Sequence, residues 1–309
     1  MPKRFFQNRA IMAQIDVTYG VDPTPTGAAN AMQAVNVTFN PSVGEEVSRE
    51  LLLSYMGHQG VILVGSYATL TFDIEIAGSG TAGTPPAFGP LLRSCALQEV
   101  ITAATDVKYK PISTLQESVT IYINVDGVNH ILLGCRGNLK FGFTPKGIPR
   151  FTFEMTGLLG TIADIPKPAL TLTAFKKPVP VSKANTTFSL HGVTGACEGV
   201  TFDLGNQIEP RFLIGAESIE HVDRQMTGSA VMEAVLLAQK NWFQIADSHT
   251  TGVLALQHGT QAGNIFKADA GAIQIGRPSY GETQKIINNT LPLMALPTAG
   301  NDEVTLTFM

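Results

Sequence analysis

Apolar and polar residues alternate along much of the chain, and a period of two is the pattern of a β-strand with one buried face. In the segment 118–125, apolar residues occupy every second position from Val119 to Val125. The pair Asp126-Gly127 comes next, and it is typical of a two-residue hairpin turn. The sequence therefore predicts a hairpin that turns at residues 126 and 127.

A second hairpin is predicted around a turn at residues 144–148, because apolar residues alternate with polar ones on both sides of it. A register that pairs Phe141 with Phe151 places the aromatic side chains on one face. A slip by one residue would instead bury Lys140. We therefore expect Phe141 to lie opposite Phe151.

Helical periodicity is confined to two segments. In the first, Thr84 is the expected N-cap and Pro85 the first helical residue. The apolar residues that recur there at helical spacing are Phe88, Leu91, Leu92, Cys95 and Ala96. The second segment runs from about 238 to 248 and contains Trp242. The expected fold is mainly β, a sandwich or barrel-like sheet with one flanking helix in each half.

A chain of 309 residues is longer than a typical single domain, so two domains are expected. Residues 166–183 contain four prolines and four lysines, a composition that favours an extended connector. We place a first module, including an N-terminal arm, at residues 1–165. A second module is placed at residues 184–309, after this linker.

The two halves share a sequence pattern that favours an internal duplication. A shift of 163 residues, from 37 to 200, lays Val37-Thr38-Phe39 on Val200-Thr201-Phe202 and Gly65-Ser66 on Gly228-Ser229. A shift of 134 residues, from 137 to 271, brings three glycines of the first half onto glycines of the second. The second half then lacks residues around the first helix.

Composition and motifs exclude several classes of function. The formal net charge is −4 and charged residues make up 15%, so the excess of Lys and Arg that tight nucleic-acid binding requires is missing. The three cysteines are widely spaced, and the six histidines show no HxH or HxxxH spacing. No apolar run of about 18 residues is present. We expect no catalytic residues, metal, cofactor or membrane insertion.

One motif is typical of a different function, the binding of a dinucleotide. Gly78-Ser79-Gly80-Thr81-Ala82-Gly83 matches the dinucleotide-binding pattern GxGxxG. However, the preceding strand alternates polar Asp73 and Glu75 with apolar residues, whereas a Rossmann strand is almost wholly apolar. Pro85-Pro86 also delays the helix beyond the glycines. We interpret the glycines as a loop that permits a tight turn.

Five segments resemble the tail tube, or major tail, proteins of long-tailed bacteriophages and prophages. They are TYGVDPTPTGAANAM (18–32), SRELLLSYMGHQGVILVGSYATLTFDIEIAGSGTAGTPPAFGPLLRSCAL (48–97), FTPKGIPRFTFEMTGL (143–158), KPVPVSKANTTFSLHG (177–192) and PTAGNDEVTLTF (297–308). The resemblance covers nearly the whole chain and implies a structural protein of the virion.

The resemblance implies a tube module, six of which form a ring, with rings stacked around a channel for DNA. If each chain holds two modules, three chains complete a ring. The partners implied are further copies, the tape-measure protein, the tail terminator and distal tail proteins, and double-stranded DNA in transit without sequence-specific binding. Assembly in the cytoplasm of the bacterial host and residence in the virion tail follow. Two alternatives stay open: the tube of a contractile injection system and a β-sandwich ligand-binding module.

Two sets of candidate site residues follow. Residues 40–60 are expected to form a long loop, either folded on its own core or, as we favour, in contact with the adjacent ring. The members of this candidate contact are Glu45, Glu46, Arg49, Leu51, Leu52, Leu53, Tyr55 and Met56. Asp73 and Glu75, on the polar side of one strand, and Glu233, on the corresponding strand of the second half, are candidate lumen acids; the alternative is that they face outer solvent.

Overall fold

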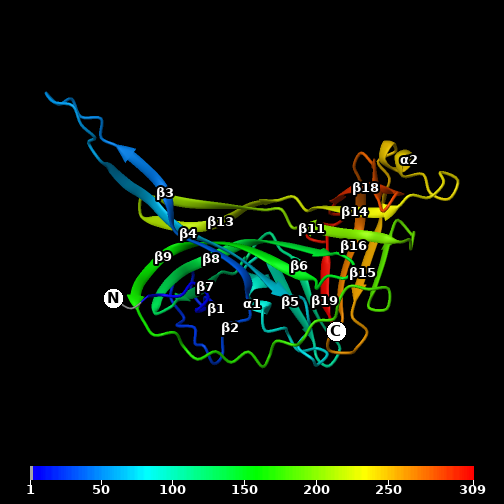
Figure 1. The fold of residues 1–309 in the computed structure, drawn as a ribbon, viewed down its shortest axis with the longest axis horizontal. Coiled ribbons are helices and arrows are strands. Elements are labelled where there is room, and N and C mark those ends of the chain that lie inside the picture. Colours follow the sequence, from blue (N-terminus) through cyan, green and yellow to red (C-terminus); the bar gives the residue numbers. More distant parts are fainter. Residues whose placement is uncertain (1–2) are drawn as a thin grey trace.

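Antiparallel strands make up most of the computed structural model, which describes residues 3–309 (Figure 1). The first half contains β1 (Arg9–Ile15), β2 (Ala31–Met32), β3 (Val35–Ser48), β4 (Val61–Glu75), α1 (Gly89–Arg93), β5 (Leu97–Thr102), β6 (Asp106–Pro111), β7 (Val119–Val125), β8 (Val128–Phe143) and β9 (Arg150–Asp164). The second half contains β10 (Thr186–Leu190), β11 (Cys197–Asp203), β12 (Asn206–Leu213), β13 (Ala216–Arg224), β14 (Thr227–Glu233), α2 (Trp242–Asp247), β15 (Thr251–His258), β16 (Phe266–Ile275), β17 (Ser279–Thr283), β18 (Ile286–Ala295) and β19 (Thr305–Phe308). The mainly β fold is confirmed.

One sheet runs through both halves of the chain. Hydrogen-bonded neighbours follow in the order β3, β4, β9, β8, β11, β14, β18 and β17. The two halves meet where β8 pairs with β11, with Phe143 opposite Val200 and Lys140 opposite Asp203. A second junction joins β6 to the C-terminal strand β19. Neither half is therefore a separate sheet.

The core is shared in the same way. The ring of Phe141 in β8 lies 5.0 Å from that of Phe202 in β11, measured between ring centroids. Phe143 stacks on Phe266 of β16 at 5.8 Å. Phe151 contacts Phe266 as well, at 5.6 Å. Aromatic side chains from both halves thus bury one another, and this contact adds to the area that each removes from water.

Both predicted hairpins are confirmed. Asp126 and Gly127 form the two-residue connection between β7 and β8. Phe141 pairs with Phe151 in the β8–β9 hairpin, in the expected register. Alternation specified this register because a slip would exchange the buried and the exposed faces.

Both helices start later than the sequence analysis expected. α1 begins at Gly89 and not near Thr84, because the preceding prolines lie in a turn closed by a hydrogen bond from Gly89 N to Pro86 O. α2 begins at Trp242, where the Asn241 side chain caps it by accepting a hydrogen bond from Gln244 N at 3.0 Å.

The order of strands in the two halves is consistent with two tandem modules. β3, β4 and β9 follow one another in the first half as β11, β14 and β18 do in the second. β1, β7 and β8 are likewise matched by β10, β15 and β16. The first half alone inserts the β5–β6 hairpin after its helix. In β4 the 163-residue shift is off by one residue. It lays Tyr67, which is half-buried, on fully buried Ala230, whereas the neighbouring residue Ala68 is fully buried.

Residues 40–60 are not the long loop that was expected. β3 continues to Ser48 and β4 starts at Val61, so that only residues 49–60 lack strand structure. The linker region between β9 and β10 contains no strand and runs along the lower side of Figure 1. Thr171 N in this region donates to Gly27 O at 2.9 Å.

The β12–β13 hairpin leaves the main sheet and crosses over β8. The chain bends sharply at Gly205, whose φ is +66° and where an added Cβ would lie 2.0 Å from Gln225 O, so a side chain has no room. Beyond the bend, Phe212 reaches Tyr67 of β4, with 6.4 Å between the ring centroids. The hairpin therefore spans the sheet of the first half from β8 to β4.

Candidate functional site

The polar face of β4 carries the two first-half candidate lumen acids. Asp73 Oδ1 accepts a hydrogen bond from Thr152 Oγ1 and Asp73 Oδ2 accepts one from Asn36 Nδ2, both at 2.7 Å. Glu75 lies on the same face, opposite Arg150 of β9. Both are half-buried. Glu233 is exposed at the end of β14, separated from β4 by β9, β8 and β11.

Two basic residues of β8, Lys140 and Arg136, are paired within the chain. Lys140 Nζ lies 2.6 Å from Glu154 Oε1 and 3.6 Å from Asp203 Oδ2. The hydrogen bond that Lys140 donates to Glu154 raises the pKa of Lys140 above its usual value. Arg136 forms an ion pair with Glu220 of β13. Sequence analysis predicted acids here, and the structure adds that the charges of Lys140 and Arg136 are balanced by intramolecular partners.

Among residues 3–309, five strands of the sheet pair on one side only: β2, β3, β5, β10 and β17. Two of them, β3 and β17, stand at the two ends of the strand order that runs through both halves. β3 pairs with β4 on one side only, and β17 pairs with β18 on one side only. β11 stands in the same place as β3 in its half, yet its second edge is covered by β8. An uncovered edge presents a row of unpaired N–H and C=O groups that can hydrogen-bond another strand.

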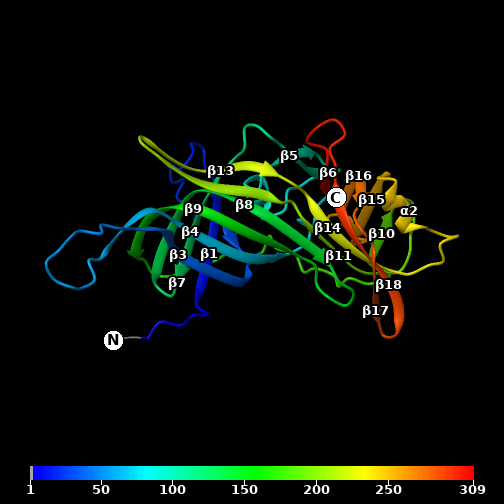
Figure 2. The same ribbon diagram turned by 90° about the horizontal axis from the view of Figure 1, so that it is seen from above.

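The distal half of the β3–β4 hairpin, residues 43–64, projects from the body of the molecule in Figures 1 and 2, and we call it the β3–β4 arm. Glu45 and Glu46 lie on its β3 strand. The other candidate contact residues are in or beside its tip: Arg49, Leu51, Leu52, Leu53, Tyr55 and Met56. Leu52 is 103% exposed and Met56 101% exposed. Apolar side chains gathered on a projecting element mark a contact surface.

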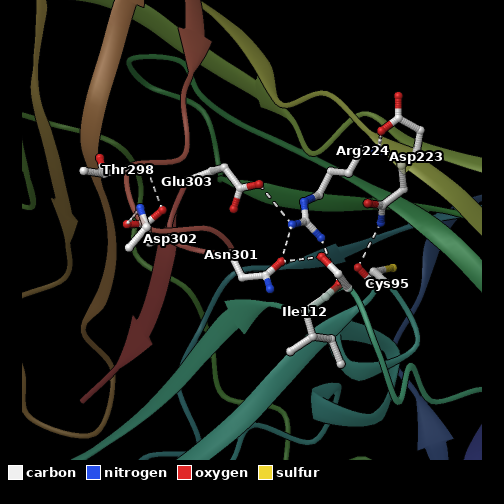
Figure 3. Close-up of polar contacts among 11 residues, drawn as sticks. Cys95, Ile112, Asp223, Arg224, Thr298, Asn301, Asp302 and Glu303 are labelled. Carbon is white, nitrogen blue, oxygen red and sulfur yellow. Dashed lines mark hydrogen bonds and ion pairs between the residues drawn. The ribbon is translucent and has the colours of Figure 1, made fainter.

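A polar cluster that sequence analysis missed lies under the β12–β13 hairpin (Figure 3). The side chain of Arg224 is 11% exposed and its Nη2 lies 3.0 Å from Glu303 Oε1. Arg224 also donates to Ile112 O at 3.1 Å and to Asn301 Oδ1 at 3.0 Å. Arg224 is therefore a largely buried charge that is paired within the chain. No local signal identifies the pair, because its two members come together only when the hairpin crosses the first half.

The glycine-rich loop at residues 78–83 has a structural role. Gly80 N donates to Gly263 O at 3.0 Å, and a Cβ at Gly78 would lie 2.0 Å from that same oxygen. The glycines therefore let two backbone segments approach closely, one from each half of the chain. Among residues 3–309, no group of three or more His, Cys, Asp or Glu side chains is placed to hold a metal ion. No helix in that range is both long and apolar enough to span a membrane.

Comparison with known proteins bears on this arrangement. A family model described as phage tail tube protein matches residues 7–308. A search of curated proteins finds no match. The match covers nearly every element of the fold, including β3, β17 and the β3–β4 arm. The chain therefore belongs to the phage tail tube protein family, whose members are structural components of the virion tail.

Proposed function

We propose that this chain assembles into rings of three copies, which stack to form the tube through which the phage genome is delivered. The observation that carries the proposal is the β8–β11 junction. In the order of strands across the sheet, β8 is the last strand of the first half and β11 is the first strand of the second half. The strands at the two ends of the same strand order are β17 and β3, and each has a free edge.

Pairing β17 of one copy with β3 of the next repeats the internal junction between copies. Each copy contributes the eight strands from β3 to β17, so three copies supply 24 strands. A head-to-tail contact joins different surfaces of identical chains. It closes into a ring when the rotation from one chain to the next is a whole fraction of 360°. Closure would leave neither the β3 edge nor the β17 edge free in the ring. Three copies of two modules match the six-module ring that the family resemblance implies.

The polar face of the sheet is the proposed wall of the channel. Asp73, Glu75 and Glu233 would contribute negative charge there, and Lys140 is held between two carboxylates. An acidic wall repels the phosphate backbone, so DNA passes without the counterion release that drives binding. A map of the assembled tube that resolves side chains tests this assignment, and an outward position for these acids would refute it.

The proposed role is structural and requires no catalysis or cofactor. Tape-measure, tail terminator and distal tail proteins are the proposed partners, and the bacterial host cytoplasm is the proposed site of assembly. A tube enclosed by a contractile sheath would use the same ring contacts. A β-sandwich that binds a ligand as a monomer is the competing class.

Electron microscopy of the purified protein, combined with mass from light scattering, tests the proposal. We expect hollow rings or tubes built from units of about 99 kDa, three times the chain mass of 32.9 kDa. Rings of six chains would keep the tube but refute the two-module count. A protein that stays monomeric at high concentration would refute assembly as its function.

A further inference from the structure

The β3–β4 arm and the β12–β13 hairpin hold the same place in the strand order, but only the hairpin is covered. β12 and β13 extend β11 and β14 as the arm extends β3 and β4. Ile219 in β13 is fully buried, whereas Met56 in the arm is fully exposed. The hairpin therefore shows, within one chain, how such an extension is accommodated.

Residues of the hairpin region bridge the end of α1 and β8. Asn206 Nδ2 donates to Cys95 O at 2.9 Å and to Gly137 O at 3.1 Å. His221 Nε2 donates to Gly137 O at 3.2 Å. Arg136 of β8 donates to Ile219 O at 2.8 Å. The extension of the second module thus closes over the helix end and the last strand of the module before it.

The corresponding place in the second half is an open pocket. It lies between the end of α2 and β16 and has a volume of about 440 Å³. Its lining includes Phe243, Ala246, Asp247, Gln274, Ile275 and Met294. Gln274 pairs with Met294 across β16 and β18, so the pocket is bounded by the sheet as well as by the helix.

The tip of the arm carries the side chains that such a pocket would accept. The tip of the arm has an apolar residue, Met56, two positions before His58, and β13 has an apolar residue, Ile219, two positions before His221. The apolar residue and the histidine two positions later are therefore present in both extensions. In the arm both residues are exposed.

We propose that the β3–β4 arm of one copy docks in the pocket between α2 and β16 of its neighbour in the same ring. Met56 takes the place of Ile219, and His58 takes the place of His221. The occupant is a second copy because each extension covers the module that precedes it, and the module preceding the first half of one chain is the second half of another. This inference rests on the proposed ring, and it replaces the adjacent ring by the lateral neighbour as the partner of the arm.

A photo-crosslinker tests the contact. The residue p-benzoylphenylalanine replaces Met56, and the protein is irradiated both as isolated rings and as stacked tubes. We expect cross-links from position 56 to residues 243–249 or 274–277 of another copy, already present in isolated rings. Cross-links that form only in stacked tubes, or that map to other elements, would overturn the proposal.

A matched pair of variants tests the pocket. Gln274→Trp fills it, while Gln257→Trp places the same side chain on β15, outside it. We expect Q274W to weaken association into rings by at least about tenfold, as loss of a central contact does, and Q257W to leave it unchanged. Equal association of both variants and wild type would overturn the inference alone. Failure of the wild-type protein to form rings at all would instead overturn the proposed function, and this inference with it.

Discussion

Phe141 of β8 and Phe202 of β11 come from different halves of the chain, and their ring centroids lie 5.0 Å apart at the junction of the two halves. Phe141 also contacts Phe151 and Phe266, and it is 4% exposed. A change at this single position therefore affects the packing of both halves.

Phe141→Ala is expected to lower the free energy of unfolding by about 3–5 kcal/mol, because it removes a buried ring and leaves a cavity. Since the sheet and the core are shared, the unfolding curves from far-UV and near-UV circular dichroism should coincide. Phe5→Ala, at a position that is 68% exposed, is the control and should change stability by less than about 0.5 kcal/mol. Two separate unfolding steps, with only one shifted by F141A, would contradict a shared core.

The buried ion pair between Arg224 and Glu303 gives a second prediction. Arg224→Met leaves the carboxylate of Glu303 without its cation, and Glu303 is 9% exposed. We expect a loss of about 3–5 kcal/mol in the free energy of unfolding. The double variant R224M/E303M should be less destabilised than R224M, because it removes the uncompensated charge. Arg277→Met on the surface is the control, and urea denaturation measures all of these variants.

Local periodicity predicted the parts of the fold that depend on it. The pairing of Phe141 with Phe151 agrees with the alternation, since a slip by one residue would bury Lys140. The start of α1 was wrong because Pro85 and Pro86 occupy a turn before the helix. Residues 40–60 were expected to form a loop because charged residues interrupt their alternation. On a projecting hairpin neither face of the strands is buried. β3 and β4 therefore continue there even though apolar and polar residues do not alternate.

Long-range relationships were not predictable from one sequence. The pairing of Val200 with Phe143 joins strands from different halves, and no local pattern specifies which edges meet. The Arg224–Glu303 pair depends on the bend at Gly205, which turns the β12–β13 hairpin across the first half. Among the candidate site residues, the acids were located by their strand face. Their position in an assembled tube stays a prediction.

Acid is expected to destabilise the fold through His221. Its Nε2 donates to Gly137 O, and burial lowers its pKa to about 4, with Arg136 and Arg224 acting in the same direction and Glu220 opposing them. In the unfolded chain the pKa is about 6.5. The unfolded state therefore binds the proton first as pH falls, and stability is lost between about pH 6.5 and pH 4.

His221→Gln tests this pH dependence, because the glutamine amide can still donate to Gly137 O. The loss of unfolding free energy between pH 7 and pH 4.5 should be about 2 kcal/mol smaller in H221Q than in wild type. His249→Gln, at an exposed position, should leave the pH dependence unchanged. An identical acid dependence in H221Q would show that other groups are responsible, such as His191 and His258, whose pKa values burial also lowers.

Proline substitutions at the free edges of β3 and β17 are each expected to block ring formation. In the β17–β18 hairpin, Thr283 pairs with Ile286 across a two-residue turn, so the N–H of the neighbouring Glu282 points away from β18. Glu282→Pro removes this outward donor and should keep the hairpin. On β3, successive N–H groups alternate between the edges, so one of Thr38→Pro and Phe39→Pro removes an outward donor, at the positions that match Thr201 and Phe202 of the internal junction. The other removes a donor to β4 and is the control for folding.

Each outward variant alone should stay monomeric by light scattering, because one of its two edges is blocked. A mixture of the β3 and β17 variants should form dimers of about 66 kDa, twice 32.9 kDa, since one intact edge remains on each chain. The dimers should not grow further, because the edges left at both ends carry proline. If each variant dimerised by itself, β3 would be pairing with β3, or β17 with β17. Either result would refute the head-to-tail ring. If the mixture stayed monomeric while wild type formed rings, the rings would be held together by other surfaces.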